Sequence, residues 1–265
     1  MNAEPTVSIQ ADPAILAATA AGRLVAKLAA LQAERGEATV VLTGGTLGIA
    51  MLAAVGEAES VADVDWSRVN FWWGDERFVA KDSPDRNELQ ARAALLDRLA
   101  LDPARVHPFG AADEFTGPDA AAAAYADELR EAARVDGAGA DAAVPRFDVL
   151  LLGIGPDAHI ASLFPEMAGI RETARTVVGV HGSPKPPPER VSLTLGAINS
   201  ADEIWLVAGG KDKAGAVGLA LAGASPVQVP AAGVRGRRQT LWLLDEQAAA
   251  EVPRSLLDGD SRPED

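Results

Sequence analysis

The sequence contains no cysteine and only three histidines. The lack of cysteine excludes disulfides, thiolate zinc sites and cysteine nucleophiles, and with them any redox chemistry by the chain's own thiols. The longest apolar runs, such as Val149–Leu152, are far shorter than the roughly 20 residues of a membrane span, and the first residues show no basic segment of a signal peptide. We therefore expect a cytoplasmic protein that is neither secreted nor inserted in a membrane.

Basic residues are also scarce, because 24 Lys and Arg stand against 38 Asp and Glu and give a net charge of −14. This charge disfavours nucleic acid and anionic membrane surfaces, so neither is expected as a partner. A small anionic ligand would need a local cluster of basic groups. The length of 265 residues fits one α/β domain, and the sequence leaves open whether the protein is a monomer or a small homo-oligomer.

Short apolar runs alternate with longer stretches rich in Ala and Leu, which predicts a Rossmann-like, three-layer α/β/α fold with a mainly parallel sheet. The expected strands are Thr39–Thr43, Arg68–Trp73, Phe147–Leu152, Thr176–Val180, Glu203–Val207 and Thr240–Leu244. The expected helices are Pro13–Arg35, Leu47–Val55, Asn87–Leu99, Pro118–Val135, Lys211–Ala222 and Glu246–Glu251. Asp85 and Glu88 resemble a capping box for the third helix. We assign residues 1–257 to a single domain and residues 258–265 to a frayed polar tail.

The first candidate site is Thr43-Gly44-Gly45-Thr46, which follows a predicted strand and precedes a predicted helix. Paired glycines allow the backbone to approach a ligand closely, and the free N–H groups of the next helix would face an anion. The same residues could form an ordinary tight turn. The pattern matches neither a Walker loop nor a dinucleotide fingerprint, so both interpretations stay open.

The second candidate is the run Trp72-Trp73-Gly74-Asp75-Glu76-Arg77, at the carboxyl end of another predicted strand. Ligands of open α/β sheets bind outside those strand ends, so Asp75 and Arg77 are well placed for a site. The alternative is a surface ion pair, which contributes only about 0–1 kcal/mol.

The segment from Phe147 to Pro165 is the most informative, because a predicted strand leads through two glycines to Asp157 and His159. A carboxylate two residues away can orient an imidazole, and an imidazole can act as a general base near neutral pH. A single histidine is more often structural, but its place in a glycine-rich loop favours catalysis. We expect no catalytic role for His107 or His181.

Two cations complete the candidates. Arg190 follows the segment Ser183–Pro188, which its prolines make a rigid loop, and Lys211 follows a predicted strand and opens a predicted helix. A lysine supplies a point charge and an arginine a bidentate fork, both suited to a phosphate. Each cation alone is more often a solvated surface charge, but in an acidic chain two cations at comparable strand ends favour a phosphate site.

At these residues the sequence resembles the 6-phosphogluconolactonase family, which is similar in fold to glucosamine-6-phosphate deaminases. The matching segments occur in the family's order and are Leu42–Gly45, Trp73–Arg77, Gly153–Pro165, Ser183–Leu195 and Val207–Ala214. The resemblance implies hydrolysis of 6-phospho-D-glucono-1,5-lactone to 6-phosphogluconate, in the oxidative pentose phosphate pathway, without a cofactor or metal. It also implies that His159 is the general acid and base, with Asp157 and Arg77 nearby.

The resemblance further implies which groups hold the 6-phosphate, namely Gly44, Gly45, Arg190 and Lys211, with the Thr46 hydroxyl near it. One departure is Ala158, where the family usually has glycine. A negative φ would make Ala158 harmless, whereas a left-handed conformation would cost roughly 1 kcal/mol or more. Two alternatives remain: a sugar-phosphate deaminase or isomerase, with Asp75 moving a carbon-bound proton, and a non-catalytic sugar-phosphate sensor.

Overall fold

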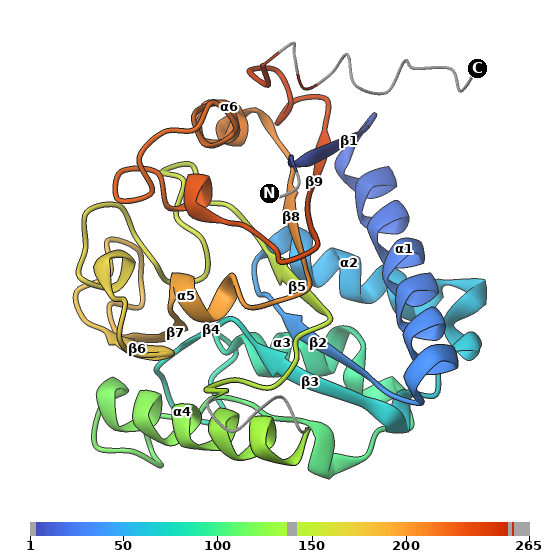
Figure 1. Ribbon diagram of the computed structural model, residues 1–265, viewed down its shortest axis with the longest axis vertical. Coiled ribbons are helices and arrows are strands. Elements are labelled where there is room, and N and C mark those ends of the chain that lie inside the picture. The colour runs from blue at the N-terminus through green and yellow to red at the C-terminus, as the bar shows by residue number, and fades with distance from the viewer. Residues whose placement is uncertain (1–3, 137–141, 254–255, 257–265) are drawn as a thin grey trace.

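A parallel sheet forms the centre of the computed structural model, which describes residues 4–136, 142–253 and 256 (Figure 1). The proposed tail, residues 258–265, lies outside the described residues. The sheet has six strands in the order β1-β9-β8-β5-β2-β3, and every neighbouring pair is parallel. Its strands are β1 (Thr6–Gln10), β2 (Ala38–Leu42), β3 (Val69–Trp73), β5 (Val149–Leu152), β8 (Glu203–Ala208) and β9 (Gln239–Asp245).

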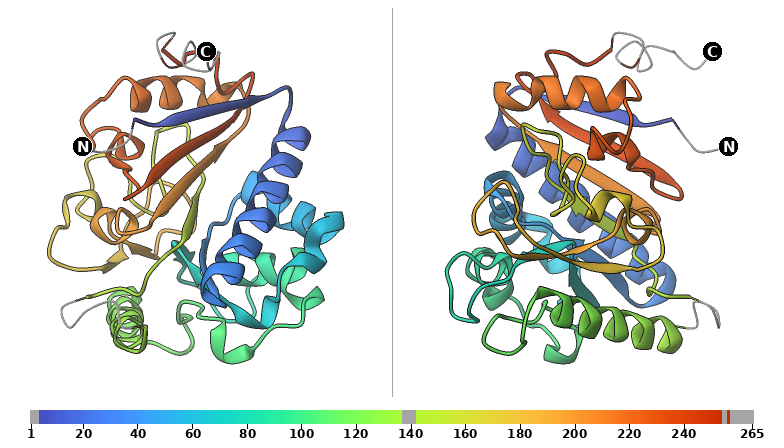
Figure 2. Two further views of the ribbon diagram at one scale, coloured as in Figure 1. Left: turned by 45° about the vertical axis from the view of Figure 1, so that its right-hand side comes forward. Right: turned by 90° about the vertical axis from the view of Figure 1, so that its left-hand side faces the viewer.

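Helices cover both faces of this sheet. They are α1 (Pro13–Arg35), α2 (Thr46–Glu57), α3 (Asn87–Ala94), α4 (Pro118–Val135), α5 (Leu195–Ile198) and α6 (Ala214–Leu221). The first three lie on one face, and α4, α5 and α6 lie on the other (Figures 1 and 2). Right-handed crossovers explain this for all of these helices but α3, because the chain moves along the sheet in one direction from β1 to β3 and in the other from β3 to β9. Helix α3 follows β3 but packs beside α2. The predicted three-layer, single-domain α/β fold is confirmed.

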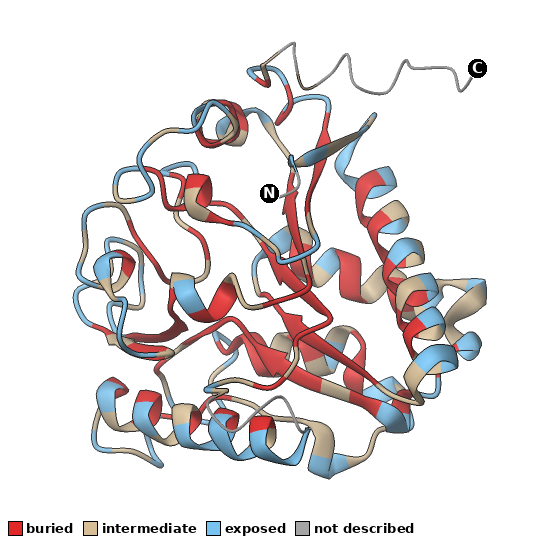
Figure 3. Ribbon diagram, viewed as in Figure 1, coloured by how far each residue is buried: buried red, intermediate tan, exposed pale blue. Residues whose placement is uncertain are grey.

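The first helix shows why these segments fold where they do. The Asp12 carboxylate caps α1 by accepting hydrogen bonds from the backbone N–H groups of Ala14 (2.9 Å) and Ile15 (2.8 Å), and Gly36 ends the helix with φ +82°. By length and composition alone, α1 could cross a membrane. Its buried side, which includes Leu16 and Leu24, instead packs into the core of the domain (Figure 3).

A smaller antiparallel sheet lies beside α4 and was not predicted. Its strands, in the order β4-β7-β6, are β4 (Asp75–Arg77), β6 (Val177–Val180) and β7 (Arg190–Leu193). The expectation that Thr176–Val180 belongs to the parallel sheet was therefore wrong, because this strand pairs with β7. Gly74 joins the two sheets, since its N–H donates to the Leu42 carbonyl (3.0 Å) and its carbonyl accepts from the Leu193 N–H (2.9 Å).

Two further local predictions were wrong. Residues 246–251 form turns rather than a helix. Asp85 and Glu88 form no capping box. Helix α3 begins at Asn87, and its first N–H groups donate to a side chain of strand β4. The Glu76 carboxylate of β4 accepts from the backbone N–H groups of Asn87 (2.7 Å) and Glu88 (2.9 Å). A sequence pattern can predict only a cap from neighbouring residues, whereas the Glu76 cap depends on the packing of β4 against α3.

Candidate active site

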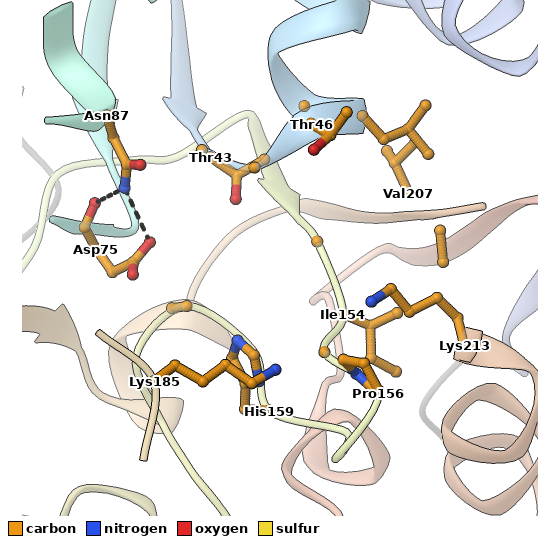
Figure 4. Close-up of a pocket in the computed structure, with 18 of the residues that line it drawn as sticks. Thr43, Thr46, Asp75, Asn87, Ile154, Pro156, His159, Lys185, Val207 and Lys213 are labelled. Atoms are coloured by element: carbon orange, nitrogen blue, oxygen red, sulfur yellow. Dashed lines mark hydrogen bonds between the residues drawn. The ribbon is translucent and has the colours of Figure 1, made fainter. Parts of the chain in front are cut away.

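A pocket of about 450 Å³ opens at the carboxyl ends of the parallel strands (Figure 4). This is the position expected for a ligand of an open α/β sheet, and the volume suits a small molecule. Most of the residues selected from the sequence line it: Gly44, Gly45, Thr46, Asp75, Arg77, His159 and Arg190. Asp157 lies behind His159, in contact with its ring, and Lys211 is outside the lining.

One wall of the pocket is the turn between β2 and α2, residues 43–46, which we call the glycine turn. Gly45 is the N-cap of α2 with φ +82°, and no side chain caps the helix. The N–H groups of the first helical turn, at Thr46, Leu47 and Gly48, therefore have no partner within the helix, and these residues line the pocket. An anion would be stabilised there by N–H donors and by the helix dipole.

The opposite wall is the loop after β5, residues 153–165, which we call the histidine loop. His159 Nδ1 lies 2.6 Å from Asp157 Oδ1. Because an ionised carboxylate only accepts, Nδ1 carries a proton, and in the neutral imidazole Nε2 then has a free lone pair. Among the described residues Nε2 has no hydrogen-bond partner, and the imidazole lines the pocket. The ring also packs against Phe164, with centroids 4.6 Å apart.

The histidine loop holds this pair in a strained backbone. Ala158 and Ala161 have φ values of +65° and +48°, and Glu166, directly after the loop, has +62°, all in or near the left-handed region that favours glycine. The departure of Ala158 from the family's glycine is therefore one that costs energy. Gly155 is required for a different reason: a Cβ there would lie 1.9 Å from His159 Nδ1. Strain of this kind is typical of functional sites.

Strand β4 presents alternate side chains to the pocket and to the interior. Asp75 is buried, its Oδ2 accepts from the Ser162 hydroxyl (2.6 Å), and it lines the pocket together with Arg77. Glu76 points the other way and lies 3.8 Å from Arg86. Burial raises the pKa of Glu76 to about 7, although Arg86 and three backbone N–H donors oppose the shift. Glu76 thus ties β4 to α3 and fixes its two neighbours at the pocket.

Arg190 is buried beside the proline-rich loop. Its Nε donates to the Pro187 carbonyl (3.2 Å) and its Nη2 to the carbonyls of Lys185 (3.1 Å) and Pro186 (2.9 Å). Its guanidinium also lies over the Phe164 ring, 5.7 Å from the centroid. Burial lowers its pKa, with Arg77 acting in the same direction and Asp75 opposing. Two neighbouring arginines on paired strands repel each other, and an anion bound between them would relieve this repulsion.

Among the lining residues that the sequence did not single out are Asn87, Lys185 and Lys213. Gly210, with φ +95°, turns the chain after β8, so that the predicted Lys211 is exposed and outside the lining, whereas Lys213, at the end of the short 3₁₀ turn, lines the pocket. Lys185 was part of the rigid loop but was not selected. Asn87 had no sequence signal, since its buried amide reaches the pocket only through the packing of α3 on β4.

Charged residues line the pocket unevenly for a chain of net charge −14. They are Arg77, Lys185, Arg190 and Lys213 against Asp75 and Asp212. Positive charge therefore gathers around the glycine turn and the histidine loop, which suits an anionic ligand. No group of three or more His, Cys, Asp or Glu that could hold a metal ion occurs among the residues the structure describes.

Residues 11–242 match the model of the family described as glucosamine-6-phosphate isomerases/6-phosphogluconolactonase. The chain belongs to this family. Within it, the chain is 56% identical to a protein of Streptomyces coelicolor named 6-phosphogluconolactonase, over 97% of this chain and 98% of the relative. The 6-phosphogluconolactonase of Mycobacterium tuberculosis is 48% identical over 94% of this chain and 98% of its own.

The solved structure of 6-phosphogluconolactonase from Trypanosoma brucei superposes with a TM-score of 0.79 at 28% identity, covering 94% of this chain and 99% of that one. Both the predicted family and the predicted fold are thereby confirmed.

Proposed function

We propose that this chain hydrolyses 6-phospho-D-glucono-1,5-lactone to 6-phosphogluconate, as the names of its relatives indicate. One observation carries the proposal: a histidine with a free Nε2, oriented by Asp157, faces a pocket rich in cations that also contains an uncapped helix N-terminus. The lactone of a phosphorylated sugar needs a base for the attacking water and a site for its phosphate. The pocket offers both within one small volume.

In the proposed reaction, water attacks the lactone carbonyl carbon while His159 Nε2 accepts one of its protons. A bond forms between the water oxygen and the carbonyl carbon, and the carbonyl oxygen becomes negatively charged. The bond to the ring oxygen then breaks, and His159 returns the proton to that oxygen. Asp157 keeps the imidazole in the required tautomer and stabilises its transient positive charge.

Negative charge on the carbonyl oxygen requires donors. Arg77 is a candidate donor, because it lines the pocket together with the buried Asp75. Its Nη1 donates to the Asp85 carbonyl (2.7 Å), which holds the guanidinium at the pocket. We assign the phosphate to the backbone of Gly44, Gly45 and Thr46 and to Arg190 and Lys213. Lys213 replaces Lys211 in this assignment, because of these two lysines Lys213 lines the pocket and Lys211 does not.

The test is stopped-flow measurement of acid release from fresh 6-phosphogluconolactone, with and without the protein. The lactone also opens spontaneously, so this background must be subtracted. We expect a protein-dependent rate that persists after chelation with EDTA. Release of ammonia and fructose 6-phosphate from glucosamine 6-phosphate would instead identify a deaminase, and no acceleration of either reaction would identify a sensor. Since the proposed substrate belongs to central carbohydrate metabolism and the chain has no cysteine, we place the reaction in the cytoplasm.

A further inference from the structure

Lys185 lies in the proline-rich loop and contacts the histidine loop. Ser183 fixes its backbone on both sides, because the Ser183 hydroxyl accepts from the Lys185 N–H (3.2 Å) and donates to the Lys185 carbonyl (2.8 Å). Arg190 donates to the same carbonyl. The side chain is half-buried and lines the pocket beside His159 (Figure 4). A lysine with a backbone so constrained presents its charge at a defined place.

The ammonium group contacts the catalytic pair itself. Lys185 Nζ lies 3.2 Å from Asp157 Oδ1 and 3.4 Å from His159 Nδ1. The same carboxylate oxygen therefore accepts from both His159 and Lys185. The other charged groups at this pocket come from β4, β7 and the turn after β8, and they are Asp75, Arg77, Arg190, Asp212 and Lys213. Lys185 and Asp157 are the charges for which a contact with the His159 ring is observed.

We propose that Lys185 is a positioning residue of the lactonase, which acts through Asp157 and sets the pH at which His159 stops being a base. The proposal rests on the function proposed above. The ammonium ion stabilises the ionised carboxylate, and its charge opposes a second positive charge on the imidazole 3.4 Å away. The charges of Lys185 and Asp157 therefore act on the imidazole in opposite directions, since a lone carboxylate favours the imidazolium and the ammonium ion disfavours it.

The state of Asp157 agrees with this arrangement. Burial raises the pKa of the Asp157 carboxyl, but its hydrogen bond and charge interaction with His159 and its ion pair with Lys185 outweigh burial and hold the pKa well below its usual range. A role in binding the substrate phosphate alone would not require the ammonium group to contact Asp157 Oδ1, the same oxygen that orients His159.

The decisive measurement is the protonation of His159 followed by NMR of ¹⁵N-labelled histidine side chains. The chain has only three histidines, and His159→Gln identifies the signal. We compare wild type with Lys185→Met, which removes the charge, and Lys185→Arg, which keeps it. Lys81→Met is the matched control, because Lys81 is exposed and pairs with Glu114 outside the pocket.

In Lys185→Met the midpoint of His159 protonation should rise by about one pH unit, as expected for removing a unit charge at this distance in a partly solvated site. The acidic limb of kcat/KM should move by the same amount. Lys185→Arg and Lys81→Met should leave the midpoint within about 0.3 unit of wild type. An unchanged midpoint in Lys185→Met overturns the proposal, including when KM rises only for the phosphorylated lactone. The NMR titration needs no activity, so failure of the lactonase assignment would be seen separately.

Discussion

Around the histidine loop, side chains hold the proposed base: Asp157 of this loop and Lys185 of the proline-rich loop contact His159, and the backbone around Ala158 is strained. On the glycine turn across the pocket, the available donors are backbone N–H groups at the start of α2, with no side-chain cap. The first wall fixes one atom, Nε2, in position. The second offers several backbone N–H donors and a positive potential, so that an anion bound there depends on no one contact. The reacting end should therefore be intolerant of small changes, and the binding end should lose function gradually.

The largest effect should follow from replacing the base. His159→Gln keeps polarity and similar size but cannot accept a proton, so kcat should fall by about 10²–10⁴-fold, the usual share of a general base. The acidic limb of the kcat/KM profile should vanish with it. Binding of 6-phosphogluconate, measured by calorimetry, should remain close to wild type because the proposed phosphate contacts, which are the glycine turn, Arg190 and Lys213, are unchanged. A folded variant with nearly normal kcat would leave Asp75 as the next candidate base.

The next effect separates the two glycines of the histidine loop. In Gly155→Ala the new Cβ would lie 1.9 Å from His159 Nδ1 and 2.4 Å from Asp157 Oδ1, so the pair must move. A displacement of about 1 Å at a reacting group can cost about 10²-fold in rate, and we expect a loss of kcat of that order. Gly153→Ala is the matched control, since nothing lies within 4 Å of its Cβ position. Equal kcat values for the two variants would show that the loop tolerates movement of the base.

The proposed phosphate contacts can be tested by comparing two nearby lysines of the turn after β8. Lys213→Ala should raise KM for the phosphorylated lactone by about 10–100-fold, the range for a charge-assisted hydrogen bond, and should change KM for unphosphorylated gluconolactone little. Lys211→Ala should alter either KM by less than about twofold, as for an exposed charge. The opposite ranking would restore the sequence-based choice of Lys211. Equal effects of Lys213→Ala on both substrates would remove that residue from the phosphate site.

The sequence predicted the histidine loop and the glycine turn because both depend on residues adjacent in the chain. The bounds of α1 and α4 were predicted to the residue, because both helices begin and end on local signals. Asp12 and Gly36 cap α1, and Pro118 occupies the first turn of α4. The strand β4 was missed because its residues, Asp75–Arg77, are all charged, and it exists only through pairing with β7.

The same distinction explains the pocket. Asn87 and Lys185 reach it from α3 and from the proline-rich loop, segments far from His159 in sequence. Their roles depend on tertiary contacts, such as the bond from Asn87 Nδ2 to the Asp75 carbonyl (2.9 Å), that no local pattern encodes. Lys211 and Lys213 differ by two residues, and only the turn at Gly210 decides which of them faces the pocket.

The smallest effect concerns strain in the histidine loop. Ala158 has φ +65°, where an alanine costs roughly 1 kcal/mol and a glycine costs little. Ala158→Gly should therefore raise the free energy of unfolding by up to about 1 kcal/mol, less about 0.5 kcal/mol for the greater freedom of glycine in the unfolded chain. Urea unfolding followed by circular dichroism measures this change in the free energy of unfolding.

The control is Ala132→Gly, inside α4, which should instead lower the free energy of unfolding by about 0.5–1 kcal/mol, because helical φ gives glycine no advantage. If both variants lose stability equally, the strain at residue 158 is relieved by its surroundings. If Ala158→Gly gains stability while kcat falls, the strain is part of what holds His159 rigid, and the contrast between the two walls becomes sharper.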